Sequence, residues 1–288
     1  MSSNLTVFNR ENAIQGPRSV LVDRTPIGYT DDDGVDFQPS WDVTPIAVDQ
    51  EYALLGHNVA GVGGTVGFRA LEMVEGSVAL LHDLAALTSI TSPMAGADFS
   101  LMPNLQLTGR LLEWWGLWTD GGVGHYMVKG NLTAPPAQKM GRKAQLLWDL
   151  KYALTRFSSG FPSGLLRLYD AVTGAATYTA VPADNATGVL ASAAPTFTFN
   201  KPMSVLALLN EHWQFLKHED LSQVAFAPSF GTVVKDGVTV TDPTKIVLTP
   251  ASALTANKVY DITIYAGIPA VDGTTIAADA TIDFTTAA

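Results

Sequence analysis

The chain has 288 residues, with 17 Lys and Arg, 27 Asp and Glu, and a formal net charge of -10. Apolar residues make up 47% of it, enough for a substantial core, which excludes global disorder. The chain contains no cysteine, which excludes disulfides, thiol nucleophiles, iron–sulfur clusters and thiolate zinc sites. The acidic balance argues against non-specific nucleic-acid binding through the whole surface.

Charged residues are scarce, at 15% of the chain against about 25% in ordinary soluble domains. Much of the surface is therefore neutral, and two explanations stay open. One is a β-rich domain coated with Thr, Ser and Ala. The other is a surface that is covered by further copies of the same chain.

The sequence predicts neither a leader peptide nor a membrane span. Residues 1–15 are polar and lack the apolar stretch of a signal peptide. The longest apolar helical stretch, 78–87, is interrupted by His82 and Asp83 and is far shorter than the ~20 residues that cross a bilayer. We therefore expect a protein that starts in the cytoplasm and has no membrane partner.

The N-terminal region is expected to hold an arm and two short strands. Residues 1–16 contain little that could form a core, so we expect an arm that is disordered alone or ordered on a partner. Strands are predicted at 19–23 and 41–49, and Pro45 places the second at a sheet edge or a bulge. The stretch 26–34 between them has strong turn chemistry.

A hairpin with a long tip and a helix are predicted next. Residues 51–64 form a Gly-rich connection, and connections of this length without secondary structure are usually functional or disordered. Residues 65–73 are expected to be the strand that completes the hairpin. Residues 75–87 are predicted as a helix because four leucines recur on one face: Leu80, Leu81, Leu84 and Leu87.

Strands dominate the region from 98 to 170. Residues 110–118 are nearly all apolar, which predicts a strand buried on both faces. The pair Gly121 and Gly122 indicates a hairpin turn. Alternation is clearest at 145–154, where five side chains share one face: Leu146, Trp148, Leu150, Tyr152 and Leu154.

The composition changes near residue 180, which predicts a linker at 181–194 and a second unit after it. Several short runs of alternating apolar residues predict a β-sandwich: Phe197 and Phe199; Ile246 and Leu248; Tyr260, Ile262 and Ile264; Ile282 and Phe284. Leu254 followed by Tyr260 resembles the tyrosine corner of immunoglobulin-like folds. A helix is predicted at 204–217.

No set of residues predicts a catalytic or metal site. The five histidines are too scattered for a ligand set, and the glycines at 61–67 lack the spacing of a dinucleotide or Walker loop. The stretch 160–164 is not a nucleophile elbow, because its serine stands one position late. We therefore expect a protein that is not an enzyme and carries no cofactor.

Two acidic features have more than one interpretation. Four aspartates cluster on the predicted turn: Asp31, Asp32, Asp33 and Asp36. A solvated turn or an acidic patch at an assembly contact is favoured over a calcium site, because EF-hand spacing is absent. Glu113 is a candidate buried carboxylate in an apolar run, and a partner such as Arg110 or an exposed place at a strand edge is favoured over a catalytic role.

Residues 28–35 read Gly-Tyr-Thr-Asp-Asp-Asp-Gly-Val. This stretch resembles the Gly-Tyr-x-x-acidic-Asp-Gly-Val stretch near the N-terminus of the major tail tube proteins of long non-contractile-tailed bacteriophages, and the order of elements resembles that family as well. The run 19–23 looks like the first strand of the family, and the hairpin, the helix and the later strands follow in its order. The resemblance implies a mainly β tail-tube domain, sandwich-like or barrel-forming, with one flanking helix.

The C-terminal part is similar to bacterial Ig-like domains. Three stretches carry this similarity: 195–203, 248–254 with Tyr260, and 282–286. Tail tube proteins often carry such a domain as an outward decoration. We therefore expect a tail tube domain at 1–182 and an Ig-like decoration domain, itself a β-sandwich, at 183–288.

The resemblance implies a structural subunit of a virion tail that is assembled in the host cytoplasm. Copies would form homohexameric rings that stack into a hollow tube around a tape-measure protein. Tail terminator and distal tail proteins would be further partners, and DNA would pass through without specific binding. The alternative is an Ig-like cell-surface or adhesive binding protein, against which the missing signal peptide argues.

Three sets of candidate residues follow from the resemblance. An acidic lumen would repel DNA phosphates, and Glu51 and Glu72 are the lumen candidates because they flank the hairpin. The acidic turn is a candidate assembly contact. The stretch 51–64 would be a stacking loop that reaches an adjacent ring, with these residues: Glu51, Tyr52, Leu54, Leu55, Gly56, His57, Asn58, Gly61, Gly63 and Gly64.

Overall fold

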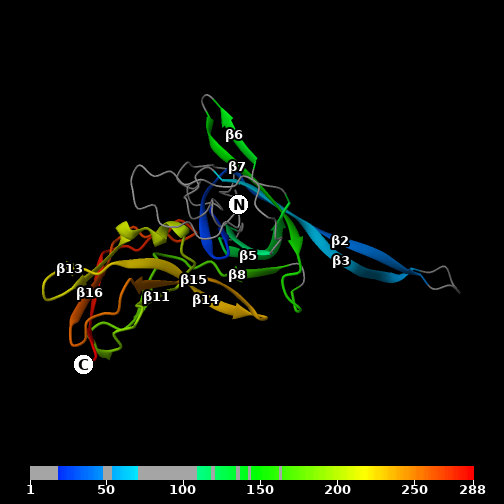
Figure 1. Ribbon diagram of the computed structural model, residues 1–288. Helices are drawn as coiled ribbons and strands as arrows, with labels where there is room; N and C mark the ends of the chain where they lie inside the picture. Colours follow the sequence, from blue (N-terminus) through cyan, green and yellow to red (C-terminus); the bar gives the residue numbers. More distant parts are fainter. Residues whose placement is uncertain are drawn as a thin grey trace.

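The computed structural model describes residues 19–47, 54–70, 109–117, 121–133, 137–141, 144–161 and 164–288. The described chain is mainly β, as expected, with strands in three sheets (Figure 1). The predicted arm at 1–16 and the predicted helix at 75–87 lie outside the described residues.

The N-terminal sheet closes into a barrel. Its strands are β1 (Ser19–Val22), β2 (Thr25–Ala47), β3 (Leu54–Ala70), β4 (Arg110–Leu117), β5 (Val123–Leu132), β6 (Ala137–Gly141), β7 (Ala144–Thr155) and β8 (Leu165–Tyr169). They follow the spatial order β6-β7-β3-β2-β1-β4-β5-β8. Residues 152–155 of β7 also pair with residues 129–132 of β5. The strands β7-β3-β2-β1-β4-β5 therefore form a closed ring.

Side chains from every strand of the closed ring fill its interior. Neighbouring side chains of a strand point to opposite faces, so each strand contributes alternate residues to this core. The buried members are Val20, Val22, Ile27, Val66, Phe68, Leu112, Trp114, Val128, Leu150 and Tyr152. The prediction that Leu150 and Tyr152 share a buried face is confirmed.

Strand β4 is buried on both faces, as its sequence predicts. Residues 111–115 are all buried. Leu112 and Trp114 point into the barrel, while Leu111 and Trp115 belong to two other apolar clusters that include residues after 200. The continuous apolar run therefore arises because the C-terminal part covers the outer face of the strand.

The long hairpin predicted after residue 41 exists, but the prediction of a long loop at 51–64 is wrong over most of its length. Strands β2 and β3 pair as far as Ala47 opposite Leu54, so residues 54–64 are strand. The residues at 48–53, which join the two strands, lie outside the described part. Glycine does not prevent this pairing, because the ladder uses only backbone N–H and C=O groups.

The predicted turn at 26–34 lies within β2, and its second half is a bulge. Thr30 is opposite Ala70, whereas Val35 is already opposite Phe68, so β2 has more residues than β3 in this interval. Gly34 has a φ of 71°, a conformation in which a residue without a Cβ is favoured. The turn chemistry of this stretch therefore bends a continuing strand and does not end it.

The C-terminal part is a sandwich of two sheets, as predicted. Their orders are β10-β17-β16-β12-β13 and β14-β15-β11-β9. The strands are β9 (Tyr178–Val181), β10 (Ala186–Val189), β11 (Thr196–Phe199), β12 (Trp213–Lys217), β13 (Ser222–Gln223), β14 (Phe226–Lys235), β15 (Val238–Pro250), β16 (Val259–Ile264) and β17 (Ala280–Thr286). All nine residues of the predicted alternating runs belong to one buried core.

Two predictions for this part are wrong. The stretch 181–194 is not a linker, because β9 pairs with β11 and β10 pairs with β17. The stretch 204–217 is not an α-helix but holds the short 3-10 helices η2 (Val205–Leu208) and η3 (Asn210–His212), followed by β12. All five residues of β12 pair with β16, so sheet pairing overrides the helical spacing of the apolar residues.

The predicted tyrosine corner is confirmed. The Thr255 backbone N–H donates to the Tyr260 hydroxyl at 2.8 Å. Tyr260 is buried, and its ring stacks on Phe284. The hydroxyl thus fixes the turn before β16 to the core of the sandwich.

Candidate functional site

The β2–β3 hairpin extends away from the rest of the molecule (Figure 1). Strand β1 pairs with β2 only at 25–29, and β7 pairs with β3 only at 65–70. Among the described strands, the segments 39–47 and 54–64 therefore pair only with each other. An isolated two-stranded hairpin is at best marginally stable in water, and its two outer edges can pair with further strands.

Most of the predicted stacking residues lie on this hairpin. The outer part of β3 holds Leu54, Leu55, Gly56, His57, Asn58 and Gly61. Gly63 and Gly64 lie nearer its base, opposite Ser40 and Pro39. Glu51, Tyr52 and the second lumen candidate, Glu72, lie outside the described residues. Contact with an adjacent ring and a place in a lumen stay predictions for all of them.

Gly64 is a position near the base of the hairpin where the structure requires glycine. Its φ is 132°, and a Cβ there would lie 2.3 Å from the Gln38 carbonyl oxygen. At Gly63 the nearest atom to such a Cβ would be Ser40 Oγ, at 3.5 Å. The base of the hairpin therefore depends on a close backbone approach at Gly64.

The four predicted acidic residues do not form a separate turn. Asp31, Asp32 and Asp33 lie in the bulge of β2, and Asp36 follows it. Asp36 is exposed and accepts hydrogen bonds from Gln38 Nε2 at 2.8 and 3.1 Å. An assembly contact at these residues stays a prediction.

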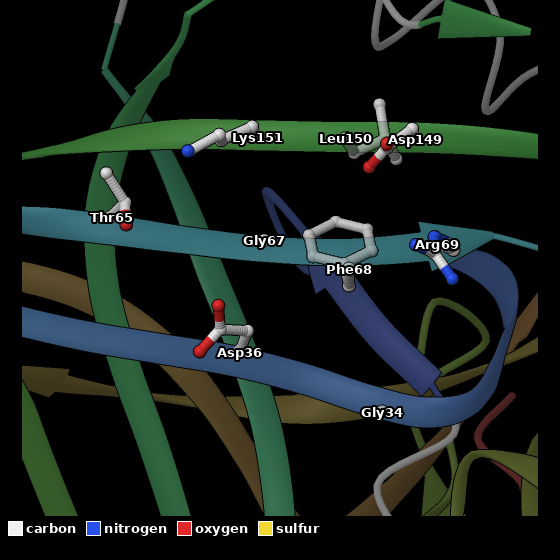
Figure 2. Close-up of a pocket in the computed structure, with 9 residues that line it drawn as sticks. All are labelled: Gly34, Asp36, Thr65, Gly67, Phe68, Arg69, Asp149, Leu150 and Lys151. Atoms are coloured by element: carbon white, nitrogen blue, oxygen red, sulfur yellow. The ribbon is translucent and has the colours of Figure 1, made fainter.

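A shallow hollow of about 430 Å³ lies on the sheet beside this bulge (Figure 2). Gly67 of β3 lies between Asp36 of β2 and Lys151 of β7, its partners on the two neighbouring strands. Two residues along β3, Arg69 lies opposite Asp149 of β7. Because Gly67 has no side chain, it leaves room between the neighbouring charges. Carboxylates and cations are balanced here, so the hollow favours neither an anion nor a cation.

Strand β8 is an edge strand of the described part of the sheet, and it exposes apolar side chains. Among the described strands it pairs with β5 alone. Two of its leucines, Leu166 and Leu168, are 41% and 60% exposed. Exposed apolar side chains along an unpaired edge are typical of a surface that other chains cover.

A buried carboxylate joins the barrel to the sandwich. Glu113 is fully buried, and its Oε2 lies 2.8 Å from His125 Nε2. The Thr241 backbone N–H donates to both Glu113 oxygens, at 3.0 and 3.2 Å, and the Thr241 hydroxyl donates to Oε1 at 3.0 Å. Both favoured alternatives for Glu113 are wrong. Arg110 pairs with Asp23 at 2.8 Å, and Glu113 is not exposed at a strand edge.

Aromatic rings surround this carboxylate. The His125 ring stacks on Trp115 with centroids 5.1 Å apart, and Trp115 also contacts Phe230 of β14. Burial raises the pKa of the nearby Tyr169 hydroxyl. Sequence reasoning missed His125, although the Gly121-Gly122 hairpin pairs Trp115 with His125 and so places Glu113 on the same face.

The comparison with protein families agrees with the sandwich and its tyrosine corner. Residues 173–286 match the bacterial Ig-like domain family. This chain carries a bacterial Ig-like domain. The family match begins before β9, whereas the division of the chain was predicted at 182/183, and that division stays a prediction.

Other comparisons add little. The crystal structure of the N-terminal part of the bacterial S-layer protein SbsC is similar at 14% identity, with a TM-score of 0.27, over 40% of this chain and 24% of that chain. A likeness of this size carries no inference. A comparison with curated proteins finds no match.

The described residues contain no helix of the length and apolarity that a bilayer crossing requires. In the same part of the chain, His, Asp and Glu side chains do not gather in groups of three or more that could hold a metal ion. The features that stand out are the hairpin, the edge strand β8 and the buried junction.

Proposed function

We propose that this chain is the tail tube subunit of a long non-contractile-tailed bacteriophage. Copies would form hexameric rings that stack into a hollow tube around a tape-measure protein, in a virion tail built in the host cytoplasm. Terminator and distal tail proteins would bind its ends, and DNA would pass through during ejection. The Ig-like domain is consistent with a structural or surface protein in general.

The β2–β3 hairpin is the observation that supports this proposal most strongly. Two strands of 23 and 17 residues run past the barrel, and their outer parts pair only with each other in the described chain. Such strands expose backbone N–H and C=O groups along both edges. Pairing with hairpins of neighbouring copies would satisfy these groups, and closure into a ring would remove the free edges.

Surface composition gives further support. Edge strand β8 presents Leu166 and Leu168, and burial between copies would remove these side chains from water. The scarcity of charge fits a chain with large contacts to its own copies, because burying unpaired charge is costly. The net charge of -10 would let DNA slide past without adhering.

Negative-stain electron microscopy of the purified protein at high concentration tests the proposal. We expect rings or tubes of stacked rings. The informative variant replaces residues 39–64 by Asn-Gly, because Gln38 and Thr65 are opposite each other and a two-residue turn can join them. This variant should keep the barrel core and stay monomeric.

Two outcomes would contradict the proposal. One is a wild-type protein that stays monomeric at every concentration. The other is a shortened variant that forms the same tubes as the wild type, since the hairpin would then have no part in assembly.

A cell-surface or adhesive binding protein is the second candidate, and the Ig-like domain is the observation that favours it. This function predicts a monomer that binds a glycan or a cell surface. A glycan array with the full chain separates the two candidates: a clear hit from a monomeric protein supports adhesion, and tubes without a hit support the tail tube.

A further inference from the structure

The Ig-like domain covers the part of the barrel's outer face that β4 and β5 form. The β14–β15 hairpin of that domain packs against β4, β5 and β8 through shared apolar clusters. One shared apolar cluster joins Leu111, Met127 and Phe157 to Val240, and a second joins Leu21, Trp115 and Val123 to Val271. These barrel side chains are buried because the Ig-like domain keeps water from them.

Glu113 makes this docking surface specific. Its carboxylate lies in the middle of the apolar face, where an unpaired charge would be very unfavourable. His125 provides one hydrogen bond from the barrel, and the Thr241 N–H and hydroxyl provide the others from β15. Oε2 keeps the hydrogen bond from His125 within the barrel, whereas the donors to Oε1 come from Thr241 of the Ig-like domain.

The connection between the two parts is also fixed. Lys201, which is 3% exposed, donates from Nζ to the carbonyl oxygens of Val172 and Gly174 at 2.9 and 2.8 Å. The same ammonium group donates to Asp272 at 2.9 Å and to Thr274 at 2.8 Å. The segment after β8 is thereby held against the Ig-like domain, so it does not act as a free hinge.

A third contact lies at the end of the β14–β15 hairpin. Asp236 accepts hydrogen bonds from the Gly160 N–H and the Ser159 hydroxyl in the segment between β7 and β8. Glu113 and this turn are two separate points of contact between the barrel and the Ig-like domain. Together with the connecting segment that Lys201 holds, they restrict the position and the orientation of one part on the other.

We propose that the folded barrel depends on the Ig-like domain, which docks on it through Glu113 and Thr241, and that the two parts unfold as one cooperative unit. The Ig-like domain is then not a detachable decoration, as the resemblance to tail tube proteins implied. This inference concerns a single chain and does not depend on the proposed assembly.

Native-state hydrogen exchange on the full chain tests the proposal. Thr241→Val removes the hydroxyl donor to Glu113 but keeps the backbone N–H and the side-chain shape. We expect exchange of the β4 and β5 amides, across the junction, to rise roughly ten- to a hundredfold, the effect of losing a hydrogen bond to a charged group. Thr239→Val, at an exposed position of the same strand, is the matched control and should leave these amides unchanged.

Calorimetry of the full chain gives an independent readout. We expect one unfolding transition for the wild type and for Glu211→Ala, a control at an exposed glutamate. Glu113→Ala leaves Thr241 and His125 without their acceptor, so its two parts should unfold in separate transitions.

Either of two results would overturn the proposal. One is a pair of separate transitions in the wild type. The other is an exchange increase in Thr241→Val that is confined to peptides of the Ig-like domain, because two independent domains would not transmit the change to the barrel.

Discussion

The barrel and the Ig-like domain are both β structures with well-filled cores, but their strands end in different ways. In the Ig-like domain, the pairs of β16 with β17 run over the whole length of β16. In the barrel, β2 and β3 continue past the last strand that pairs with their outer edges. Strand β16 thus lies between two paired neighbours, β12 and β17, whereas the outer parts of β2 and β3 have no further strand beside them in the described chain.

This difference separates two kinds of stability. Residues of the Ig-like core should set the free energy of unfolding, because they are buried in a single chain. Residues of the outer hairpin beyond the close approach at Gly64 should have little effect on the fold and a large effect on assembly.

Phe215→Ala should have the largest effect on the fold. Phe215 is fully buried and its ring lies near those of Phe226, Tyr260 and Phe284. The cavity should lower the free energy of unfolding by about 3 to 5 kcal/mol in urea denaturation. Phe161→Ala, at a side chain that is 41% exposed, is the control and should change it by less than about 0.5 kcal/mol.

Gly64→Ala should loosen the base of the hairpin. The new Cβ would meet the Gln38 carbonyl oxygen in a backbone conformation that favours glycine, at a cost of about 1 to 3 kcal/mol. Tubes or rings should be lost in electron micrographs. Gly63→Ala has room for its Cβ and should assemble like the wild type, so equal behaviour of the two variants would contradict the role of the hairpin.

Tyr260→Phe should have a smaller effect, because it removes one hydrogen bond of the Ig-like domain and no apolar contact. It leaves the partly buried Thr255 N–H without its acceptor, and we expect a loss of about 1 kcal/mol in urea denaturation. Tyr265→Phe, at a partly exposed ring, is the matched control. An equal loss in both variants would show that the tyrosine corner does not stabilise this domain.

Low pH should remove the small contribution that Asp220, a surface residue, makes to the free energy of unfolding. Hydrogen bonds from the Ser222 side chain and N–H, and from Lys217, lower the pKa of Asp220 from 3.8 to about 2. Its stabilising effect is therefore complete above the unfolded-state pKa of 3.8 and is lost as the pH falls through about 2. The unfolding midpoint of Asp220→Asn should fall less steeply over this interval than that of the wild type, and equal slopes would contradict this.

Local patterns predicted the strands of both parts well. Alternation marked Phe197 and Tyr260 as core residues, and the all-apolar run around Trp115 indicated a strand covered on both sides. The helical spacing of apolar residues at 204–217 predicted a helix that does not form. There β12 pairs with β16, a strand that follows much later in the sequence. Sheet pairing is a tertiary interaction, and no local pattern contains it.

The candidate site was less predictable than the fold. Glu113 could be singled out from the sequence, but its main partner, Thr241, lies 128 residues further along the chain. Nothing in the sequence near Thr241 indicates an acidic partner. The length of the hairpin was also missed, because a Gly-rich stretch favours a loop until the backbone register shows that its glycines lie in a ladder.

Hydrogen exchange of the hairpin at low and high protein concentration is the most direct test of the central claim. We predict that amides at 39–47 and 54–64 exchange fast in the dilute monomer and become strongly protected as the protein assembles. Amides of β16 should be protected equally in both states. Hairpin amides that are already as protected as β16 in the monomer, or that stay unprotected in assembled protein, would contradict the account.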